Sequence, residues 1–297
     1  MQKKQKVLVI VGPTSSGKSA LAVELAKRFN GEVISADSRQ VYRGLNIGTG
    51  KITKREMKGV RHYLLDIASA KRKFSADDYV RHARTAIRDI ASRGKLPIVA
   101  GGTGFYIDAL VGRIILPNVP PNLAFRRIHN KTAVAELLCM LEKVDPERAK
   151  TIEPNNKRRI IRALEITAAL GHVPYNDIVS RYEALWIGLA PPLATLEKKI
   201  RIRLFARIRE GMVAEAKRLH AAGLSYKRME ELGLEYRFLA RLLQGKVTRS
   251  QMVEELNRTI RKYAIRQTRY WKRNKDIKWF EPKSRKIRSV IRTWLRK

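Results

Sequence analysis

Short apolar runs and helix-like patterns alternate along much of the chain. The runs, typical of strands buried in a parallel sheet, occupy positions 7–11, 31–36, 62–66, 96–100 and 185–189. Between them lie segments with apolar residues at helical spacing, such as 19–26 and 75–92. This alternation predicts an α/β fold in which a parallel sheet core is flanked by helices.

The middle of the chain departs from this alternation. Pro117, Pro120 and Pro121 mark a linker, and the patterns after them are helical until the strand at 185–189. We therefore expect a helical insertion domain at residues 117–183. The core domain is then formed by residues 1–116 and 184–297.

Two long amphipathic helices are predicted after that last strand. In the first, apolar residues recur four apart from Leu196 to Met212, and Gly223 closes the segment. The second spans about residues 250–272. From Arg258 to the end the chain has sixteen Lys or Arg and two acidic residues, with aromatic residues interleaved. We expect a basic helical C-terminal region whose aromatic residues mostly form a small core, although some could stack on unpaired bases.

The composition adds a charge that solubility alone does not need. Among 297 residues, 63 Lys and Arg outnumber 27 Asp and Glu, and the pI is near 10.8. This excess favours a polyanionic partner, nucleic acid before an acidic membrane surface. The single cysteine, Cys139, lies in an apolar run and reads as a core residue of a reducing compartment. We expect a cytoplasmic protein with no signal peptide, no membrane span and no zinc site.

The first strand and the helix after it enclose a phosphate-binding pattern. The pattern G-x-x-x-x-G-K-S is formed by Gly12, Pro13, Thr14, Ser15, Ser16, Gly17, Lys18 and Ser19. Between a strand and a helix it predicts a P-loop, whose backbone N–H groups surround phosphate oxygens. Lys18 would reach a phosphate and the Ser19 hydroxyl would hold Mg²⁺. The loop predicts a bound di- or triphosphate, without saying which.

Further polar residues follow other strands. Asp37, Ser38, Arg39 and Gln40 come directly after the strand 31–36. Ligands of open α/β sheets bind outside the carboxyl ends of strands, so Asp37 is a candidate general base, or else an ordinary turn carboxylate. After the strand 96–100, the turn Gly101–Gly104 holds Thr103, and either a ligand or local packing explains its glycines. The loop 48–51 offers Lys51 as another cation for phosphate.

One helix of the expected insertion has a basic face. It contains Arg158, Arg159, Ile160, Ile161 and Arg162. With this net charge, the face is either merely solvated or a contact to a nucleic-acid backbone.

Together these motifs resemble those of the tRNA dimethylallyltransferases, also called tRNA isopentenyltransferases. The resemblance covers nearly the whole chain and rests on residues 12–19, 35–42, 48–51, 101–104, 158–165 and 266–271. Gly50 stands where the family usually has alanine, and residues 233–237 depart from a common glycine-tyrosine pair. With one cysteine the chain cannot carry the zinc finger of many eukaryotic members, so it resembles the bacterial form.

The resemblance implies a function. A dimethylallyl group would pass from dimethylallyl diphosphate, held with Mg²⁺ in the P-loop, to N6 of adenosine 37 beside the tRNA anticodon. Asp37 matches the general base, Thr103 the residue that supports the reacting centre, and Arg203 an arginine that contacts the diphosphate. Residues 37–40 and 158–162 match the segments that contact the tRNA anticodon loop. We expect a monomer.

Three alternatives share parts of this pattern. An isopentenyltransferase acting on free adenine nucleotide would have the P-loop and Asp37, but it would need no basic insertion. A P-loop nucleoside or nucleotide kinase would bind ATP at the loop. An RNA-binding nucleotide switch would bind without chemistry.

Overall fold

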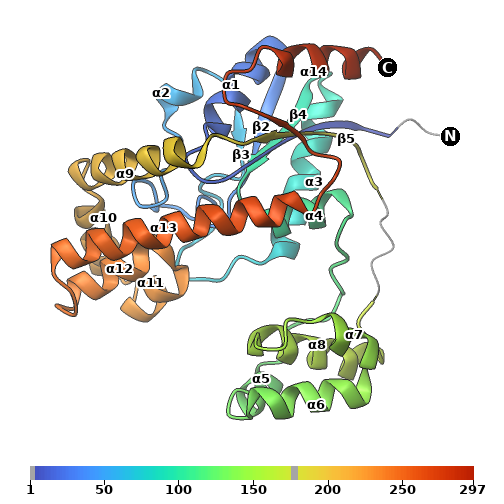
Figure 1. Cartoon of the computed structure of the whole chain (residues 1–297), viewed down its shortest axis with the longest axis vertical. Helices are drawn as coiled ribbons and strands as arrows, with labels where there is room; N and C mark the ends of the chain where they lie inside the picture. Colours follow the sequence, from blue (N-terminus) through green and yellow to red (C-terminus); the bar gives the residue numbers. More distant parts are fainter. Residues whose placement is uncertain (1–3, 175–179) are drawn as a thin grey trace. The chain divides into compact units, whose positions relative to one another are not determined.

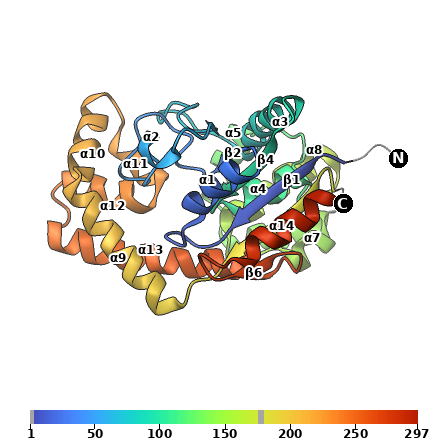
Figure 2. The same ribbon diagram turned by 90° about the horizontal axis from the view of Figure 1, so that it is seen from above.

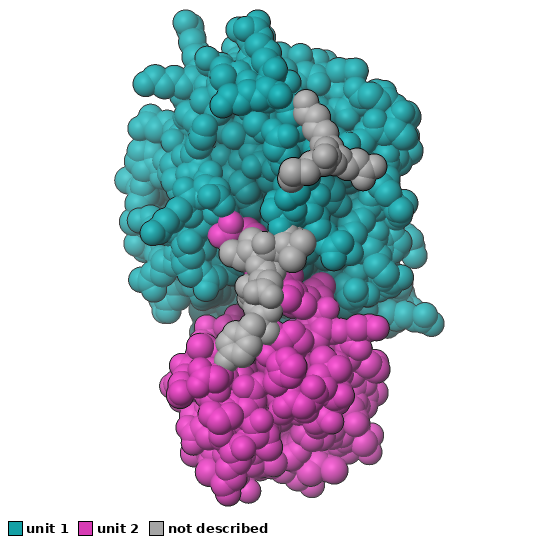
Figure 3. All heavy atoms as spheres, turned by 90° about the vertical axis from the view of Figure 1, so that its right-hand side faces the viewer, with its two compact units in different colours: residues 1–112, 180–297 teal, residues 113–179 magenta. Residues whose placement is uncertain are grey.

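The computed structural model describes residues 4–174 and 180–297. The chain divides into two compact units, Met1–Gly112 with Ser180–Lys297, and Arg113–Val179 (Figure 3). Unit 1 and unit 2 name these two parts below. The division lies a few residues before the boundaries expected from the sequence, and β5 already begins at Glu183.

Unit 1 contains one six-stranded sheet in which every pair of neighbours is parallel. The strand order is β3-β2-β4-β1-β5-β6. The strands are β1 (Lys6–Val11), β2 (Gly31–Ala36), β3 (His62–Tyr63), β4 (Leu96–Gly101), β5 (Glu183–Leu189) and β6 (Lys278–Phe280). The parallel sheet was predicted, but β3 is shorter than the expected 62–66 because Leu64 and Asp66 have positive φ. The short edge strand β6 was missed, since it lies in a basic segment without an apolar run.

Helices cover both faces of the sheet. One face packs against α1 (Lys18–Arg28) and α14 (Lys286–Arg296), through residues such as Leu8, Leu25 and Ile287. Figures 1 and 2 show α14 beside α1, and Arg288 forms an ion pair with Glu24 across them. The helices α3 (Ala76–Ser92) and α4 (Gly104–Val111) contact β4 without contributing to that cluster, which places them on the other face. The basic C-terminal segment is therefore partly a helix that closes the sheet.

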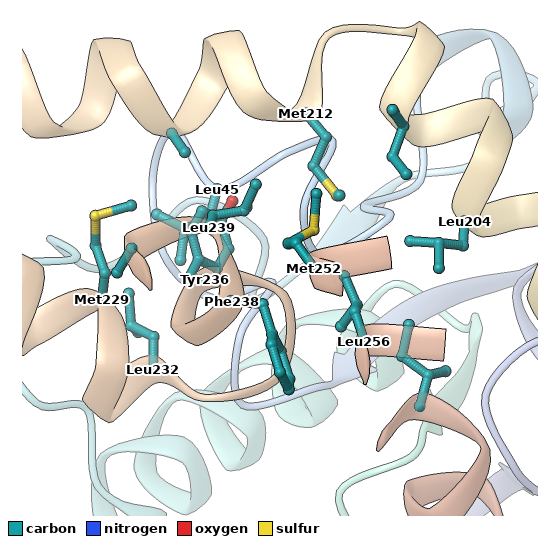
Figure 4. Close-up of a cluster of buried hydrophobic side chains, with 14 of the residues drawn as sticks. Leu45, Leu204, Met212, Met229, Leu232, Tyr236, Phe238, Leu239, Met252 and Leu256 are labelled. Atoms are coloured by element: carbon teal, nitrogen blue, oxygen red, sulfur yellow. The ribbon is translucent and has the colours of Figure 1, made fainter. Parts of the chain in front are cut away.

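Five further helices in the described part of unit 1 form a second hydrophobic core. They are α9 (Leu193–Arg209), α10 (Met212–Ala221), α11 (Tyr226–Leu232), α12 (Leu234–Leu243) and α13 (Arg249–Lys272). The short helix α2 (Lys54–Met57) has no buried residue and does not belong to this core. Leu204, Met212, Leu239 and Leu256, from four of these helices, are buried in that core (Figure 4). The prediction of one helix through Met212 was wrong, because Gly211 at φ 99° separates α9 from α10. None of the helices in the described residues is long and apolar enough to cross a membrane.

Unit 2 is helical in its described residues. Its helices are α5 (Leu123–His129), α6 (Val134–Val144), α7 (Pro146–Thr151) and α8 (Lys157–Leu170). Leu137 and Leu141 of α6 pack with Ile160 and Ile161 of α8 in a small core. Cys139 is exposed, so its prediction as a core residue was wrong. Residues four apart share the inner face of α6, and Cys139 lies midway between them on the outer face.

Candidate active site

The P-loop lies between the carboxyl end of β1 and the first turn of α1. Both of its glycines have backbone angles that other residues rarely adopt, with φ 143° at Gly12 and 97° at Gly17. A Cβ on Gly12 would also lie 2.7 Å from the carbonyl oxygen of Leu189 in β5. Both positions therefore require glycine, as expected of a phosphate-binding loop that leads into a helix N-terminus.

Lys18 lies among other charges at this end of the sheet. Its ammonium donates a hydrogen bond of 2.6 Å to the carbonyl of Pro13 in the same loop. Burial and, next, the positive charge of Arg203 lower the pKa of Lys18 to about 7, although the negative charge of Asp37 acts the other way. Lys18, Arg203 and Asp37 are thus close enough to interact. Added negative charge beside Lys18 would therefore stabilise its charged form.

Asp37 and Thr103 are brought together because β2 and β4 are neighbours. The backbone N–H of Thr103 donates to Ala36 at the end of β2 (3.1 Å), and its Oγ1 accepts from the N–H of Ser38 (3.0 Å). Gly101 permits this approach, since a Cβ there would lie 2.1 Å from the Ala36 carbonyl oxygen. β4 in turn lies beside β1, so Asp37, Thr103 and the P-loop follow three adjacent strands.

The carboxylate of Asp37 combines the two interpretations that the sequence left open. Its Oδ1 accepts from the N–H groups of Arg39 (2.8 Å) and Gln40 (3.2 Å), as a turn carboxylate does. Its Oδ2 forms no hydrogen bond among the described residues. One oxygen is therefore fixed by the turn, and the other is available to a ligand.

Arg203 reaches the site from α9 by way of the loop 46–51. Its guanidinium donates to the carbonyl of Gly50 (2.8 Å). A Cβ on Gly50 would lie only 2.4 Å from Nη2 of this guanidinium. Glycine at this position, where the resembling family usually has alanine, therefore leaves room for the guanidinium.

Lys51, in the same loop, was expected to offer a cation for phosphate, and the structure gives it another role. Its side chain is 5% exposed and its ammonium donates to Tyr42 O (2.8 Å), Asn46 Oδ1 (3.0 Å) and Asp66 Oδ1 (2.5 Å). An ammonium has three protons, so these partners use all of them. Lys51 stabilises the loop instead of facing a ligand.

Buried side chains of α10 and α12 also hold the loop 46–51. The carboxylate of Glu215 accepts from the N–H groups of Asn46, Ile47 and Gly48, at 2.8–3.0 Å. It also accepts from the Tyr236 hydroxyl (2.7 Å). Residues 233–237, where the chain departs from the resembling family, thus take part in supporting this loop.

The basic residues of α8 lie in unit 2 and differ from one another. Arg158 and Arg159 are exposed, and Arg159 pairs with Glu153 on the surface. Arg162 is half-buried and bonded to Glu165 and to the carbonyl of Val119. Ile160 and Ile161 are buried in the core of unit 2, so contacts that α8 makes through side chains in this segment come from its arginines.

Sequence reasoning overlooked Gln267 in α13 as a site residue. Its side-chain oxygen accepts from the N–H of Thr14 in the P-loop (2.8 Å), and its side-chain nitrogen donates to the carbonyl of Gly102 (2.9 Å). Tyr263, one turn earlier on α13, lies near enough to Asp37 for the carboxylate to raise its pKa, after burial as the main cause. A single polar residue on the apolar stripe of this helix is the signal that could have revealed Gln267.

The fold and this edge of the sheet define a P-loop protein of the α/β class. Comparison with known proteins narrows the class. A model of the IPP transferase family matches residues 40–274. The chain is 37% identical to the tRNA dimethylallyltransferase of Anoxybacillus flavithermus and 38% identical to that of Bacillus subtilis, over 93% and 94% of its length and 90% and 91% of theirs. The chain belongs to the IPP transferase family.

Solved structures agree with this assignment. A tRNA isopentenylpyrophosphate transferase of Bacillus halodurans matches with a TM-score of 0.75 and 37% identity, covering 98% of this chain and 96% of that one. A eukaryotic dimethylallyltransferase acting on tRNA matches with a TM-score of 0.82 and 27% identity, covering 93% and 74%. The fold is therefore that of solved structures of this family.

Proposed function

We propose that this protein is a tRNA dimethylallyltransferase, which transfers a dimethylallyl group from dimethylallyl diphosphate to N6 of adenosine 37 in tRNA. The observation that carries the proposal is the meeting of a P-loop, a carboxylate and a hydroxyl at the ends of β1, β2 and β4 in a member of this family. The names of its relatives support the substrate. The net charge of +36 suits an RNA partner.

Asp37 is the base in this proposal. The adenine amino nitrogen attacks C1 of the dimethylallyl group, the C1–O bond to diphosphate breaks, and the N6 proton passes to a carboxylate oxygen. Because the two amides fix Oδ1, Oδ2 is the oxygen presented to that proton. Thr103, whose Oγ1 accepts from the N–H of Ser38, keeps this turn beside the end of β4.

The diphosphate leaves with the bonding electrons, so its negative charge must be stabilised. The amides of the P-loop, the Lys18 ammonium and the Arg203 guanidinium supply donors for this purpose. Because the pKa of Lys18 is lowered to about 7, a diphosphate beside it favours the charged ammonium. The same groups would bind the donor and stabilise the leaving group.

The residues at the loop are compatible with Mg²⁺. Ser19 is exposed at the first turn of α1 and offers a hard hydroxyl oxygen. Among the described residues, no group of three or more His, Cys, Asp or Glu could hold a metal ion. An ion with one protein ligand would complete its shell with water and diphosphate oxygens, a set that Mg²⁺ accepts. When bound, Mg²⁺ would neutralise charge on the diphosphate.

The RNA contacts are assigned to exposed and basic residues. We propose that residues 37–40, the exposed arginines Arg158 and Arg159 of α8, and exposed basic side chains of the C-terminal helices of unit 1 contact tRNA. Adenosine 37 has to leave its stack to reach Asp37, which costs a few kcal/mol and least in an unpaired loop.

A transfer assay tests the proposal. The protein is incubated with tRNA, dimethylallyl diphosphate and Mg²⁺, and the nucleosides are analysed by mass spectrometry. We expect N6-dimethylallyladenosine at position 37, and Asp37→Asn should slow single-turnover transfer by about 10²–10⁴-fold while tRNA affinity stays similar. Modification of free AMP in preference to tRNA would contradict the proposal, as would tight ATP binding without donor binding.

A further inference from the structure

The amide of Gln267 joins two loops that belong to different strands. The P-loop follows β1, and the turn Gly101–Gly104 follows β4. Gln267 Oε1 accepts from Thr14 N in the first loop, at 2.8 Å, and Gln267 Nε2 donates to Gly102 O in the second, at 2.9 Å. Gln267 itself is only 7% exposed and lies on α13. No other side chain links these two loops in the hydrogen bonds of the described residues.

The chemistry of this link admits few other side chains. Thr14 N can only donate and Gly102 O can only accept, so the bridging group needs an acceptor and a donor on one terminus. A neutral carboxamide offers both, whereas a carboxylate offers only acceptors. The same requirement fixes the orientation of the amide, with its oxygen toward the P-loop.

Two glycines of the turn make room for α13. A Cβ on Gly102 would lie 2.3 Å from Gln267 Nε2, and a Cβ on Gly104 would lie 2.1 Å from the ring of Tyr270. Contact with α13 thus explains the glycines at positions 102 and 104, whereas Gly101 permits the approach to Ala36.

We propose that Gln267 is a positioning residue of the transferase reaction, an inference that rests on the proposed function. By bonding Thr14 and Gly102, it sets the distance between the loop that binds the diphosphate and the turn that carries Thr103. In the proposed reaction the P-loop holds dimethylallyl diphosphate. The turn that carries Asp37, the base for the adenosine, is bonded to Thr103 through the N–H of Ser38. A reaction between two bound partners depends steeply on their separation, and a misplacement of about 1 Å can cost about 100-fold in rate.

The test compares three variants. Gln267→Leu removes both hydrogen bonds and keeps a side chain of similar size. Gln267→Glu removes only the N–H group that donates to Gly102 O, and Thr268→Val is the matched control. Thr268 is the next residue of α13 and its hydroxyl bonds only within the helix, to Ala264 O. We expect Gln267→Leu to slow single-turnover transfer by about 100-fold. Its tRNA affinity should stay within about threefold of the wild-type value, and Thr268→Val should behave as wild type.

Gln267→Glu adds a readout that a merely structural role would not move. A carboxylate oxygen would face the Gly102 carbonyl oxygen, while a protonated carboxyl group could donate to it again. The ordinary pKa of glutamate, about 4.3, is raised by burial and by that carbonyl. We therefore expect the rate of Gln267→Glu relative to wild type to rise as the pH is lowered from about 8 to about 6.

Both possible failures are distinguishable. Transfer rates of Gln267→Leu and Gln267→Glu within about threefold of wild type, at every pH, would overturn the positioning role. If the wild-type protein transfers nothing to tRNA, the proposed function fails instead, and hydrogen exchange at the Thr14 amide still decides the link. Faster exchange at Thr14 in Gln267→Leu than in Thr268→Val supports it, and equal exchange overturns it.

Discussion

The P-loop and the loop 46–51 both combine glycines with a lysine, and their lysines have opposite surroundings. Lys18 bonds to one carbonyl of its own loop, and burial and Arg203 lower its pKa to about 7. Lys51 has three oxygen partners, including the carboxylate of Asp66, and its side chain is almost fully buried. A negatively charged ligand would therefore stabilise the ammonium of Lys18, whereas the ammonium of Lys51 is already paired with the carboxylate of Asp66.

This difference is the one expected between a loop that binds a ligand, as we propose for the P-loop, and a loop that only supports the fold. The loop 46–51 is held by Glu215 through three amides and by Arg207 through the carbonyl of Gly48, at 2.8 Å. What it contributes to the site is the carbonyl of Gly50, which orients Arg203. A glycine-lysine pattern alone does not distinguish the two cases, because the partners of the lysine come from distant parts of the chain.

The largest expected effect concerns Lys18 of the P-loop and the rate of transfer. Lys18→Met keeps the aliphatic stem and removes the charge, so donor phosphates and the leaving diphosphate lose one cation. We expect transfer to slow by about 10²–10³-fold, as for other single groups that stabilise a developing anion. Thermal unfolding should not occur at a lower temperature, since the lowered pKa means that the charged lysine does not stabilise the fold near pH 7. A near-normal rate would place Lys18 with Lys51.

The matched substitution in the other loop should do the reverse. Lys51→Met leaves Tyr42 O, Asn46 Oδ1 and Asp66 without their donor. Because buried acceptors without partners are costly, we expect the free energy of unfolding to fall by about 1–3 kcal/mol. Chemical denaturation measures this. The folded variant should still bind dimethylallyl diphosphate with nearly normal affinity, and a loss of donor binding as large as that of Lys18→Met would mean that both lysines face the ligand.

The sequence was sufficient for the features that short-range patterns encode. The strand-loop-helix context of residues 7–26 revealed the P-loop, and the position of Asp37 and Thr103 after buried strands placed them at one edge of the sheet. Lys51 and Gln267 could not be assigned in this way, because their roles depend on partners such as Asp66 and Thr14 that only the folded chain brings near. The break at Gly211 was missed because the apolar stripe continues through it.

A smaller effect concerns the pH dependence of donor binding. The free Lys18 has a pKa near 7, and a bound diphosphate raises it, so binding takes up a proton above pH 7. The association constant should therefore be highest near or below pH 7 and fall as the pH rises, by at most about tenfold per pH unit. Calorimetry in buffers of different ionisation enthalpy measures the proton uptake. Lys18→Met should show none between pH 7 and 9, and a wild-type protein without uptake would contradict the lowered pKa.

The smallest expected effect extends the comparison to α8 of unit 2. This helix has exposed arginines and an arginine bonded to a buried carboxylate within one short segment. Arg158 and Arg159 are exposed, whereas Arg162 is bonded to Glu165, a residue only 3% exposed. The surface pair of Arg159 with Glu153 is of the kind worth little, so phosphate can replace it. We therefore expect RNA contacts from the first two arginines and a stabilising role for the third.

Measured tRNA affinity against salt concentration separates these roles. The slope of log affinity against log salt is negative, and each lost phosphate contact makes it less steep by about 0.7 for single-stranded RNA. Arg158→Ala combined with Arg159→Ala should therefore make it less steep by up to about 1.4. Donor binding at the P-loop should not change. Arg162→Ala should leave the slope alone but destabilise unit 2, because Glu165 loses one of its two arginine partners, Arg126 being the other. A flattened slope in a folded Arg162→Ala variant, with none in the double variant, would reverse the assignment of exposed and bonded arginines.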